Sequence, residues 1–258
     1  MKTILLTGGS SCIGRATAIQ LSKLGRHVIT IGRDKGRLHQ LQEAHPDIEV
    51  ICADLAVVSD RMMVYETIGD RKLDALINNA GIATPTGDLL SVDRTDFRYQ
   101  LSINVEAPLF FAKRLHKNLQ NGRILNLTIY SSLKVNRGLA CYGISKAALN
   151  MLTQYLKEEL SEHHIQVGLT LPGLVDTTIQ NQLPKGALAD KAKDMKQRGE
   201  LLSPETTARL LSWLTLEASD TQFSEGMVDI YDTHHHPHWL PEGQNIQPSQ
   251  QILSLIQG

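Results

Sequence analysis

Two side chains spaced four residues apart could carry out proton transfer. Tyr142 and Lys146 stand in the stretch Tyr-Gly-Ile-Ser-Lys, and residues four apart share one face of a helix. A free tyrosine, with a pKa of about 10, is a sluggish acid or base near neutral pH. A nearby ammonium stabilises the phenolate and lowers that pKa. Such a pair suits carbonyl reduction, which needs a proton donor beside the oxygen as hydride reaches the carbon.

The same spacing occurs again at Tyr130 and Lys134. This second pair comes directly after an apolar run at 123–127, where the backbone is expected to leave a sheet rather than to run helical. The first pair, by contrast, continues into a helical stretch. We therefore predict that Tyr142 and Lys146 are the catalytic pair.

A glycine-containing turn between the first apolar run and the first helical stretch could hold phosphate groups. Glycines let the backbone approach a pyrophosphate, and the N-terminus of the following helix supplies N–H groups and positive potential. The turn therefore predicts a dinucleotide site, with these candidate contacts: Thr7, Gly8, Ser10, Ser11, Ile13 and Gly14.

The end of the second apolar run predicts which dinucleotide binds. Sites that prefer NAD carry an acid there to hold the ribose 2′-hydroxyl. This chain has Gly32 and Arg33 instead. Gly32 leaves room, and the guanidinium of Arg33 can make a forked contact to a 2′-phosphate, although it could also be a solvated side chain. The missing acid favours NADP as the cofactor.

Together these motifs resemble the short-chain dehydrogenase/reductase family over about residues 2–231. Thr7, Gly8 and Gly14 match the family's Thr-Gly-x-x-x-Gly-x-Gly turn, whereas Cys12 stands at its middle glycine. A side chain there crowds the backbone beside the cofactor, so weaker binding or a displaced turn is expected. Within the family, the chain most resembles the sepiapterin- and benzil-reductase-like members.

The resemblance implies further cofactor contacts. Asp54 corresponds to the residue that meets the adenine ring, and Lys146 to the lysine that also bonds the nicotinamide ribose. The Asn-Asn-Ala-Gly stretch at 78–81 passes beside the cofactor, and the Pro-Gly-x-Val-x-Thr stretch at 172–177 holds the nicotinamide carboxamide. The stretch 174–183 is then expected to cover the substrate. The contacts implied in these two stretches are Asn79, Ala80, Gly81, Pro172, Gly173, Val175 and Thr177.

The resemblance also implies a role for Asn104, and it shows one position where this chain departs from the family. Asn104 corresponds to a helix asparagine that holds a water in a proton relay; the alternative is a polar residue that packs the helix. The family places a serine thirteen residues before the tyrosine, where it donates to the substrate oxygen, but this chain has Ile129. Loss of one such donor costs about 10²–10³ in rate in other enzymes.

Three arrangements could compensate for Ile129. Thr128 could turn inward through a bulge, Ser131 or Ser132 could fold back into the site, or the substrate could be reactive enough to need no donor. Strand alternation points Thr128 away from the side of Ile129, so we rank the serines first as surrogates.

The elements that must position these residues alternate between short apolar runs and helical stretches. Runs of this kind, rich in Val, Ile and Leu, are typical of parallel strands covered on both faces, joined by right-handed crossovers. We expect one α/β domain over 1–231, a single Rossmann-type doubly wound parallel sheet of about seven strands with helices on both faces. Its strands are expected at 3–7, 27–31, 49–53, 75–78, 123–127, 166–171 and 226–231, with helices that include 13–24 and 141–163.

The last 27 residues differ in composition from the rest. Residues 232–258 hold three prolines, five glutamines and four clustered histidines, and we expect an extension of the same domain that is either packed on its surface or partly disordered. The histidines could bind added nickel, but a physiological metal needs convergent geometry, so we predict none. Helical stretches 101–115 and 149–160 correspond to those that pair subunits in the family, which implies a homodimer or homotetramer.

Composition narrows the setting. A formal net charge of −1 offers no broad basic field, which argues against nucleic acid or an anionic membrane as partner. Three cysteines are too few for a disulfide framework, and we expect neither a signal peptide nor a bilayer span; these features favour the cytoplasm.

The sequence therefore predicts an oxidoreductase that transfers hydride between NADP(H) and a small-molecule ketone, aldehyde or dicarbonyl. The alternative is a catalytically weakened NADP-binding sensor or partner protein, which Ile129 and Cys12 favour. An epimerase is disfavoured, because the chain is short for a separate substrate domain.

Overall fold

The computed structural model describes residues 1–177, 179, 182–183 and 187–256. Part of the predicted covering stretch, and the last two residues of the extension, lie outside the described residues. A seven-stranded, wholly parallel sheet runs through the molecule in the order β3-β2-β1-β4-β5-β6-β7. The strands are β1 (Thr3–Thr7), β2 (His27–Gly32), β3 (Ile48–Cys52), β4 (Ala75–Asn78), β5 (Arg123–Leu127), β6 (Gln166–Leu171) and β7 (Met227–Asp229).

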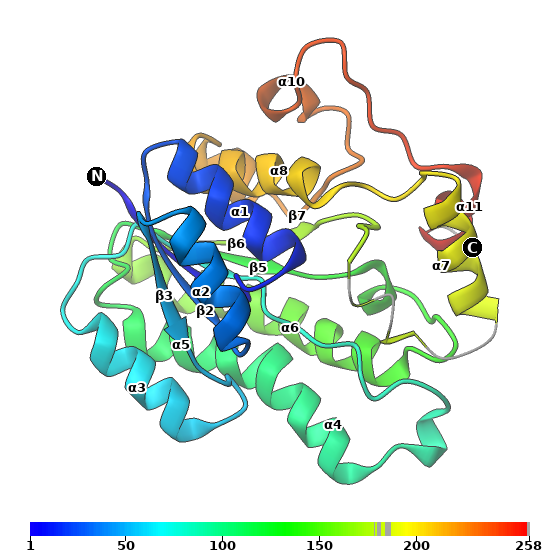
Figure 1. The fold of residues 1–258 in the computed structure, drawn as a ribbon, viewed down its shortest axis with the longest axis horizontal. Helices are drawn as coiled ribbons and strands as arrows, with labels where there is room; N and C mark the ends of the chain where they lie inside the picture. The colour runs from blue at the N-terminus through cyan, green and yellow to red at the C-terminus, as the bar shows by residue number, and fades with distance from the viewer. Residues whose placement is uncertain (178, 180–181, 184–186, 257–258) are drawn as a thin grey trace.

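Helices cover both faces of this sheet (Figure 1). One face packs on α1 (Cys12–Lys23) and α8 (Pro204–Leu216), and the other on α3 (Val58–Ile68), α5 (Ala107–Leu115) and α6 (Ala140–Glu159). Alternate residues of β1 show the division: Ile4 and Leu6 belong to the first core and Leu5 to the second. The remaining helices are α2 (Lys35–Ala44), α4 (Arg94–Leu101), α7 (Ala187–Gln197), α9 (Asp220–Ser224), α10 (His236–Trp239) and α11 (Gln250–Ile256).

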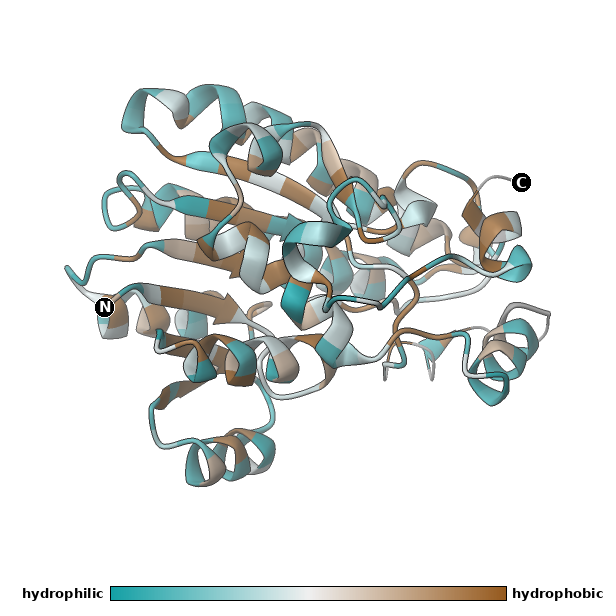
Figure 2. Cartoon of the chain, turned by 90° about the horizontal axis from the view of Figure 1, so that it is seen from above, coloured by the Kyte–Doolittle hydropathy of each residue, from teal (hydrophilic) through white to brown (hydrophobic). Residues whose placement is uncertain are grey.

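Burial on both faces explains the apolar strands. Hydrophobic residues concentrate on the strands and on the inner sides of the helices, whereas outer helical faces are polar (Figure 2). The predicted fold class is therefore confirmed. The order of strands reverses between β1 and β4, and in sheets of this kind ligands bind beyond the carboxyl ends of the strands at that switch point.

Two predicted elements differ from the structure by more than one residue at an end, whereas β2, β3 and α1 differ by a single residue. The helix expected over 141–163 ends at Glu159 and is followed by a 3-10 turn, Ser161–His163, which in turn ends where His164 takes a left-handed φ of 54°. The last strand is shorter than expected, since β7 pairs with β6 only over Met227–Asp229.

The C-terminal extension packs on the domain. Trp239 and Leu240 are each 8% exposed and belong to the same core as α8, so they hold the extension on the domain. His236 bonds the carbonyl of Ile230 through Nε2, and His238 stacks on Trp213. Within the part of the chain that the structure describes, histidine, cysteine and acidic side chains form no metal-binding group of three or more. No helix among those same residues could span a membrane.

Candidate active site

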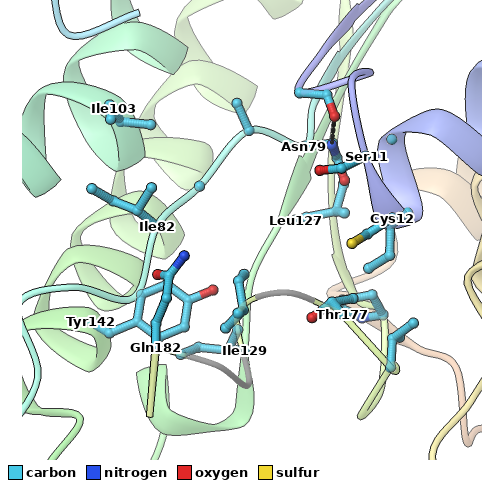
Figure 3. Close-up of a pocket in the computed structure, with 18 of the residues that line it drawn as sticks. Ser11, Cys12, Asn79, Ile82, Ile103, Leu127, Ile129, Tyr142, Thr177 and Gln182 are labelled. Atoms are coloured by element: carbon cyan, nitrogen blue, oxygen red, sulfur yellow. Dashed lines mark hydrogen bonds between the residues drawn. The ribbon is translucent and has the colours of Figure 1, made fainter. Parts of the chain in front are cut away.

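A cavity of about 510 Å³ lies at the carboxyl ends of the central strands. Its charged lining residues, Arg33, Asp34, Arg37 and Asp54, follow β2 and β3 at one end. Tyr142 borders it together with apolar side chains from the segments after β4, β5 and β6 (Figure 3). Most of the predicted cofactor residues, together with Tyr142 and Ser131, thus line one cavity with a polar end and an apolar end, whereas Thr7, Asn104, Ser132 and Lys146 are not among its lining residues.

The glycine turn after β1 is closely packed, which explains two of its residues. Gly8 has a φ of +80°, and a Cβ on Gly14 would lie 2.1 Å from the Gly8 carbonyl oxygen. Cys12, where the family has glycine, opens α1 with a φ of +48° and lines the cavity. A left-handed conformation costs a non-glycine residue about 1–2 kcal/mol, so the turn keeps its glycine-like shape at the expense of local strain.

Hydrogen bonds fix this turn to the one after β4. Asn79 donates from Nδ2 to the carbonyl oxygen of Thr7 over 2.9 Å, and the N–H of Ala80 donates to the Thr7 hydroxyl over 3.0 Å. Gly8, Asn79, Ala80 and Gly81 all line the cavity. The cradle suits a pyrophosphate, because it combines exposed backbone with a helix N-terminus.

The polar end holds a chain of three side chains. The Arg33 guanidinium donates through Nη1 to the Tyr99 hydroxyl, which donates to Asp54 Oδ2 over 3.0 Å. Arg37 pairs with Asp34 over 3.1 Å. Sequence reasoning missed Arg37 and Tyr99. Arg37 lies four residues after Arg33, in the first turn of α2, a closeness in the sequence that could have indicated it, whereas Tyr99 comes from distant α4.

Lys146 and Tyr142 stand on the buried face of α6. Lys146 is 3% exposed, and its Nζ donates to the Leu127 carbonyl oxygen over 2.8 Å. A Cβ on Gly81 would lie 3.4 Å from that Nζ, so the ammonium sits beside the turn after β4. Burial lowers the pKa of Lys146 to about 8 and raises the pKa of Tyr142 well above its usual value.

In the second pair, Tyr130 and Lys134 bond to different parts of the protein and not to a common site. Tyr130 donates its hydroxyl to Asp229 over 2.7 Å, whereas Lys134 reaches the Ser254 carbonyl oxygen over 3.5 Å. The pair occupies a 3-10 turn, Tyr130–Ser132, and the segment after it, where four-residue spacing does not align side chains.

Asn104 lies in a π-helical turn, Ser102–Glu106, between α4 and α5. Its side chain accepts from the N–H of Ile82 over 3.0 Å and donates to the Ile82 carbonyl and the Ser145 hydroxyl, each over 2.9 Å. Both amide hydrogens therefore have protein partners, and Asn104 joins the segment after β4 to α6. The predicted water relay would have to use its remaining lone pair.

The three hydroxyls beside Ile129 face different ways. Ser132 donates to the Ile129 carbonyl oxygen over 2.6 Å and accepts from Asn150 over 2.8 Å. Thr128 bonds Asn150 over 2.5 Å, so Ser132 and Thr128 belong to a polar cluster directed at α6. Ile129 itself points into the cavity (Figure 3). Ser132, which is not among the residues that line the cavity, stays a predicted surrogate, but its hydroxyl proton is already directed at the Ile129 carbonyl oxygen.

Ser131 does reach the cavity. It lines the same cavity as Tyr142, and a Cβ on Gly143 would lie 2.6 Å from the Ser131 carbonyl oxygen, so glycine permits this close approach. Asn136 donates from Nδ2 to the Ser131 hydroxyl over 2.9 Å. Because that oxygen accepts from Asn136, its own hydrogen is directed elsewhere and can serve a ligand.

The segment after β6 forms the remaining wall. Pro172, Gly173, Val175 and Thr177 line the cavity, and Val175 bridges to Leu202. Gln182, which sequence reasoning missed, also lines it and accepts from the Ala83 N–H over 3.0 Å. This bond joins the segment after β4 to the segment after β6, and no local sequence signal marks it because its partners are 99 residues apart.

Comparisons with known proteins agree with this geometry. The short chain dehydrogenase family profile matches residues 2–187. An uncharacterized short-chain type dehydrogenase/reductase of Sinorhizobium fredii is 31% identical over 211 residues, 80% of this chain and 82% of that protein. A 3-oxoacyl-(acyl-carrier-protein) reductase of Rickettsia conorii is 33% identical over 186 residues, 70% of this chain and 76% of that one.

A solved structure shares the fold. A short-chain dehydrogenase/reductase from Saccharomyces cerevisiae superposes with a TM-score of 0.85 at 22% identity, covering 93% of this chain and all of that one. The predicted likeness to sepiapterin- and benzil-reductase-like members is not confirmed and stays a prediction. The match of the family profile, which covers most of the sheet and the predicted nicotinamide-dinucleotide cradle, shows that this chain belongs to the short-chain dehydrogenase/reductase family of oxidoreductases, which bind nicotinamide cofactors.

Proposed function

We propose that the protein reduces the carbonyl group of an apolar ketone, aldehyde or dicarbonyl with NADPH. The observation that carries this proposal is the convergence of Tyr142 and Ser131 at the apolar end of the cavity, beside the turn that Lys146 contacts. The name of the Rickettsia relative, a 3-oxoacyl reductase, also favours carbonyl reduction.

The cavity's residues suggest how the cofactor would be held. Gly8, Ser10, Ser11, Ile13 and Gly14 would receive the pyrophosphate, because they line the cavity at the N-terminus of α1 and the absence of a Cβ on Gly14 lets the turn pack this closely. The other cofactor contacts would be Asp54 at the adenine, Lys146 at the nicotinamide ribose, and the residues after β4 and β6. NADPH, when bound, supplies the hydride.

Arg33 supports the preference for NADP. It stands at the end of β2, and a Cβ on the preceding Gly32 would lie 2.9 Å from the Ser10 hydroxyl oxygen. The chain therefore passes close to the phosphate turn and directs a guanidinium to the polar end of the cavity. A guanidinium there can pair with a 2′-phosphate through a forked contact.

Three side chains would divide the proton chemistry. Tyr142 would donate its phenolic proton to the substrate oxygen, and the Ser131 hydroxyl, oriented by Asn136, would donate a hydrogen bond to the same oxygen. The Lys146 ammonium would stabilise the tyrosinate that forms, which offsets the rise in the pKa of Tyr142 that burial alone produces.

The wall around these groups favours an apolar substrate. The side chains of Ile82, Ile129, Leu139, Leu183 and Leu201 line this end of the cavity. An unpaired carboxylate would lose its hydration against such a wall at a cost of several kcal/mol. The replacement of serine by Ile129 extends the wall toward Tyr142.

Subunit pairing is also proposed. Ile144, Met151 and Tyr155 recur along one face of α6 and are 44%, 59% and 61% exposed. Large apolar side chains gathered on one helix face favour association with another surface. We propose that two copies pair there; light scattering should report a dimer or tetramer, and Met151→Lys should shift it toward the monomer.

The main experiment is a panel of neutral and charged carbonyl compounds with NADPH and NADH, read as loss of reduced-cofactor absorbance. Turnover of neutral aromatic aldehydes with NADPH, and weak or absent turnover of their carboxylate analogues, is expected. Ile129 and the strained Cys12 favour the second candidate, a weakened NADP-binding protein. Tight NADPH binding without turnover of any carbonyl would select it.

A further inference from the structure

The C-terminal helix α11 packs against α7 at the apolar end of the cavity (Figure 1). Ile252 of α11 is 1% exposed and shares a small core with Ala192 and Met195 of α7. Ala192 and Met195 also line the cavity. The apolar wall facing a substrate is thus backed directly by the end of the chain.

Polar contacts join the same two segments. Lys191 of α7 donates to the Ser254 hydroxyl over 2.6 Å, and Gln251 donates to Asp194 over 3.0 Å. Ser249 donates to Glu200, just beyond α7, over 2.6 Å. Two of these bonds have a carboxylate acceptor and one an ammonium donor, which makes them stronger than bonds between neutral groups.

The opposite wall is tied to α11 as well. Lys134 donates to the Ser254 carbonyl oxygen over 3.5 Å, and Lys134 belongs to the segment that carries Ser131 and Asn136. An 11-residue helix such as α7 is marginal by itself, so its position depends on what it packs against. Docking of α11 therefore sets the distance between the two walls.

We propose that α11 is a positioning element for substrate binding, which holds α7 in place so that the cavity fits a bulky apolar carbonyl compound. This inference rests on the proposed function. The pyrophosphate cradle lies on β1, α1 and β2, away from α11, so the effect on substrate binding exceeds the effect on dinucleotide binding. A small aldehyde, which needs only the groups around Tyr142, depends little on α11.

The test compares Ile252→Ala and a chain ending at Gln247 with the wild type. Ile252→Leu, which keeps the apolar bulk, is the rescue variant, and Gln250→Ala, on the exposed side of α11, is the matched control. Kinetic constants are measured for naphthaldehyde and for propanal, and the dissociation constant of NADPH by fluorescence. Calorimetric binding of naphthalenemethanol to the NADPH complex adds a readout that needs no turnover.

Ile252→Ala should raise KM for naphthaldehyde and the dissociation constant of naphthalenemethanol about tenfold, a loss of about 1.4 kcal/mol. The truncated chain should show a larger rise. Values for propanal and NADPH should stay within about twofold, and Ile252→Leu and Gln250→Ala should resemble the wild type.

Three results would overturn the inference: unchanged naphthalenemethanol binding in both Ile252→Ala and the truncated chain, equal losses for the two aldehydes, or a matching loss of NADPH affinity. Failure of the proposed function looks different. In that case the wild type binds NADPH yet turns over neither aldehyde, while naphthalenemethanol binding still reports whether α11 shapes the cavity.

Discussion

At the scale of single residues, we propose that a hydroxyl two positions later, that of Ser131, offsets the substitution of Ile129 for serine. Strand alternation favours Ser131 and Ser132 over Thr128 as surrogates, but it cannot choose between the two serines. In a 3-10 turn the direction of each hydroxyl depends on partners from elsewhere: Asn150 of α6 takes Ser132, and Asn136 takes Ser131. Those partners lie in segments whose placement only the fold determines.

Ser131→Ala should reduce kcat for an apolar aldehyde by about 10²-fold, because it removes one donor to the developing oxyanion. Ser132→Ala, the neighbouring control, should leave kcat within about twofold. Ile129→Ser should give little gain in the wild type but should restore part of the rate in Ser131→Ala. Steady-state kinetics of these three single variants and of the double variant test which serine is the donor. A large loss of kcat in Ser132→Ala with no loss in Ser131→Ala would reverse the assignment.

The buried Lys146 predicts a dependence of stability on pH. Burial lowers the pKa of Lys146 to about 8 from 10.5. Below pH 8 the folded protein therefore holds a buried ammonium, which lowers the free energy of unfolding. This destabilisation disappears as pH rises from the folded pKa toward the unfolded pKa. Tyr142, whose pKa is raised, acts in the opposite direction only above pH 10. Stability relative to Lys146→Met should therefore increase between about pH 8 and pH 10, by up to about 3 kcal/mol.

Urea unfolding of the cofactor-free protein and of Lys146→Met across this pH range measures the effect. A difference between the two proteins that stays flat, or that shrinks as pH rises, would show that the ammonium of Lys146 is not desolvated in the folded state.

At the scale of elements, the sequence predicts strands better than it predicts irregular turns. The expected bounds of β1, β4, β5 and β6 agree with the structure, because continuous Val, Ile and Leu runs reflect burial on both faces. The π-helical turn at Ser102–Glu106 has no such local signal, since Asn104 is held there by Ile82 and Ser145 from other segments. Periodicity likewise missed that Tyr99 reaches Arg33.

The end of β2 carries the prediction on cofactor choice. Arg33→Ala should weaken NADPH binding by about tenfold or more while changing NADH binding little, because only NADPH has the 2′-phosphate. Arg15→Ala, on the outer side of α1 away from the cavity, is a control for general loss of positive charge. Equal losses for the two cofactors would contradict the NADP assignment.

At the scale of the whole molecule, the strand order switches between β1 and β4. This switch brings the family's sequence motifs, which follow β1, β2 and β4, together at one edge of the sheet. Motif recognition could therefore predict from the sequence most of the residues that line the proposed cofactor end of the cavity. The substrate end is assembled from segments after β5 and β6, from α7 and from the C-terminal helix, whose mutual placement follows from tertiary packing. Composition alone left two possibilities for residues 232–258, an extension packed on the surface or a partly disordered one. In the structure, the described part of this segment packs on the domain.

The measurement closest to the central claim is NADPH oxidation in the presence of naphthaldehyde by the wild type and by Tyr142→Phe. The wild type should turn over, and Tyr142→Phe should lose at least about 10³-fold in kcat while binding NADPH with unchanged affinity, because its hydroxyl supplies the proton and does not hold the dinucleotide. Tyr130→Phe should retain turnover. A fully active Tyr142→Phe, or a wild type that binds NADPH and reduces no carbonyl, would contradict the account.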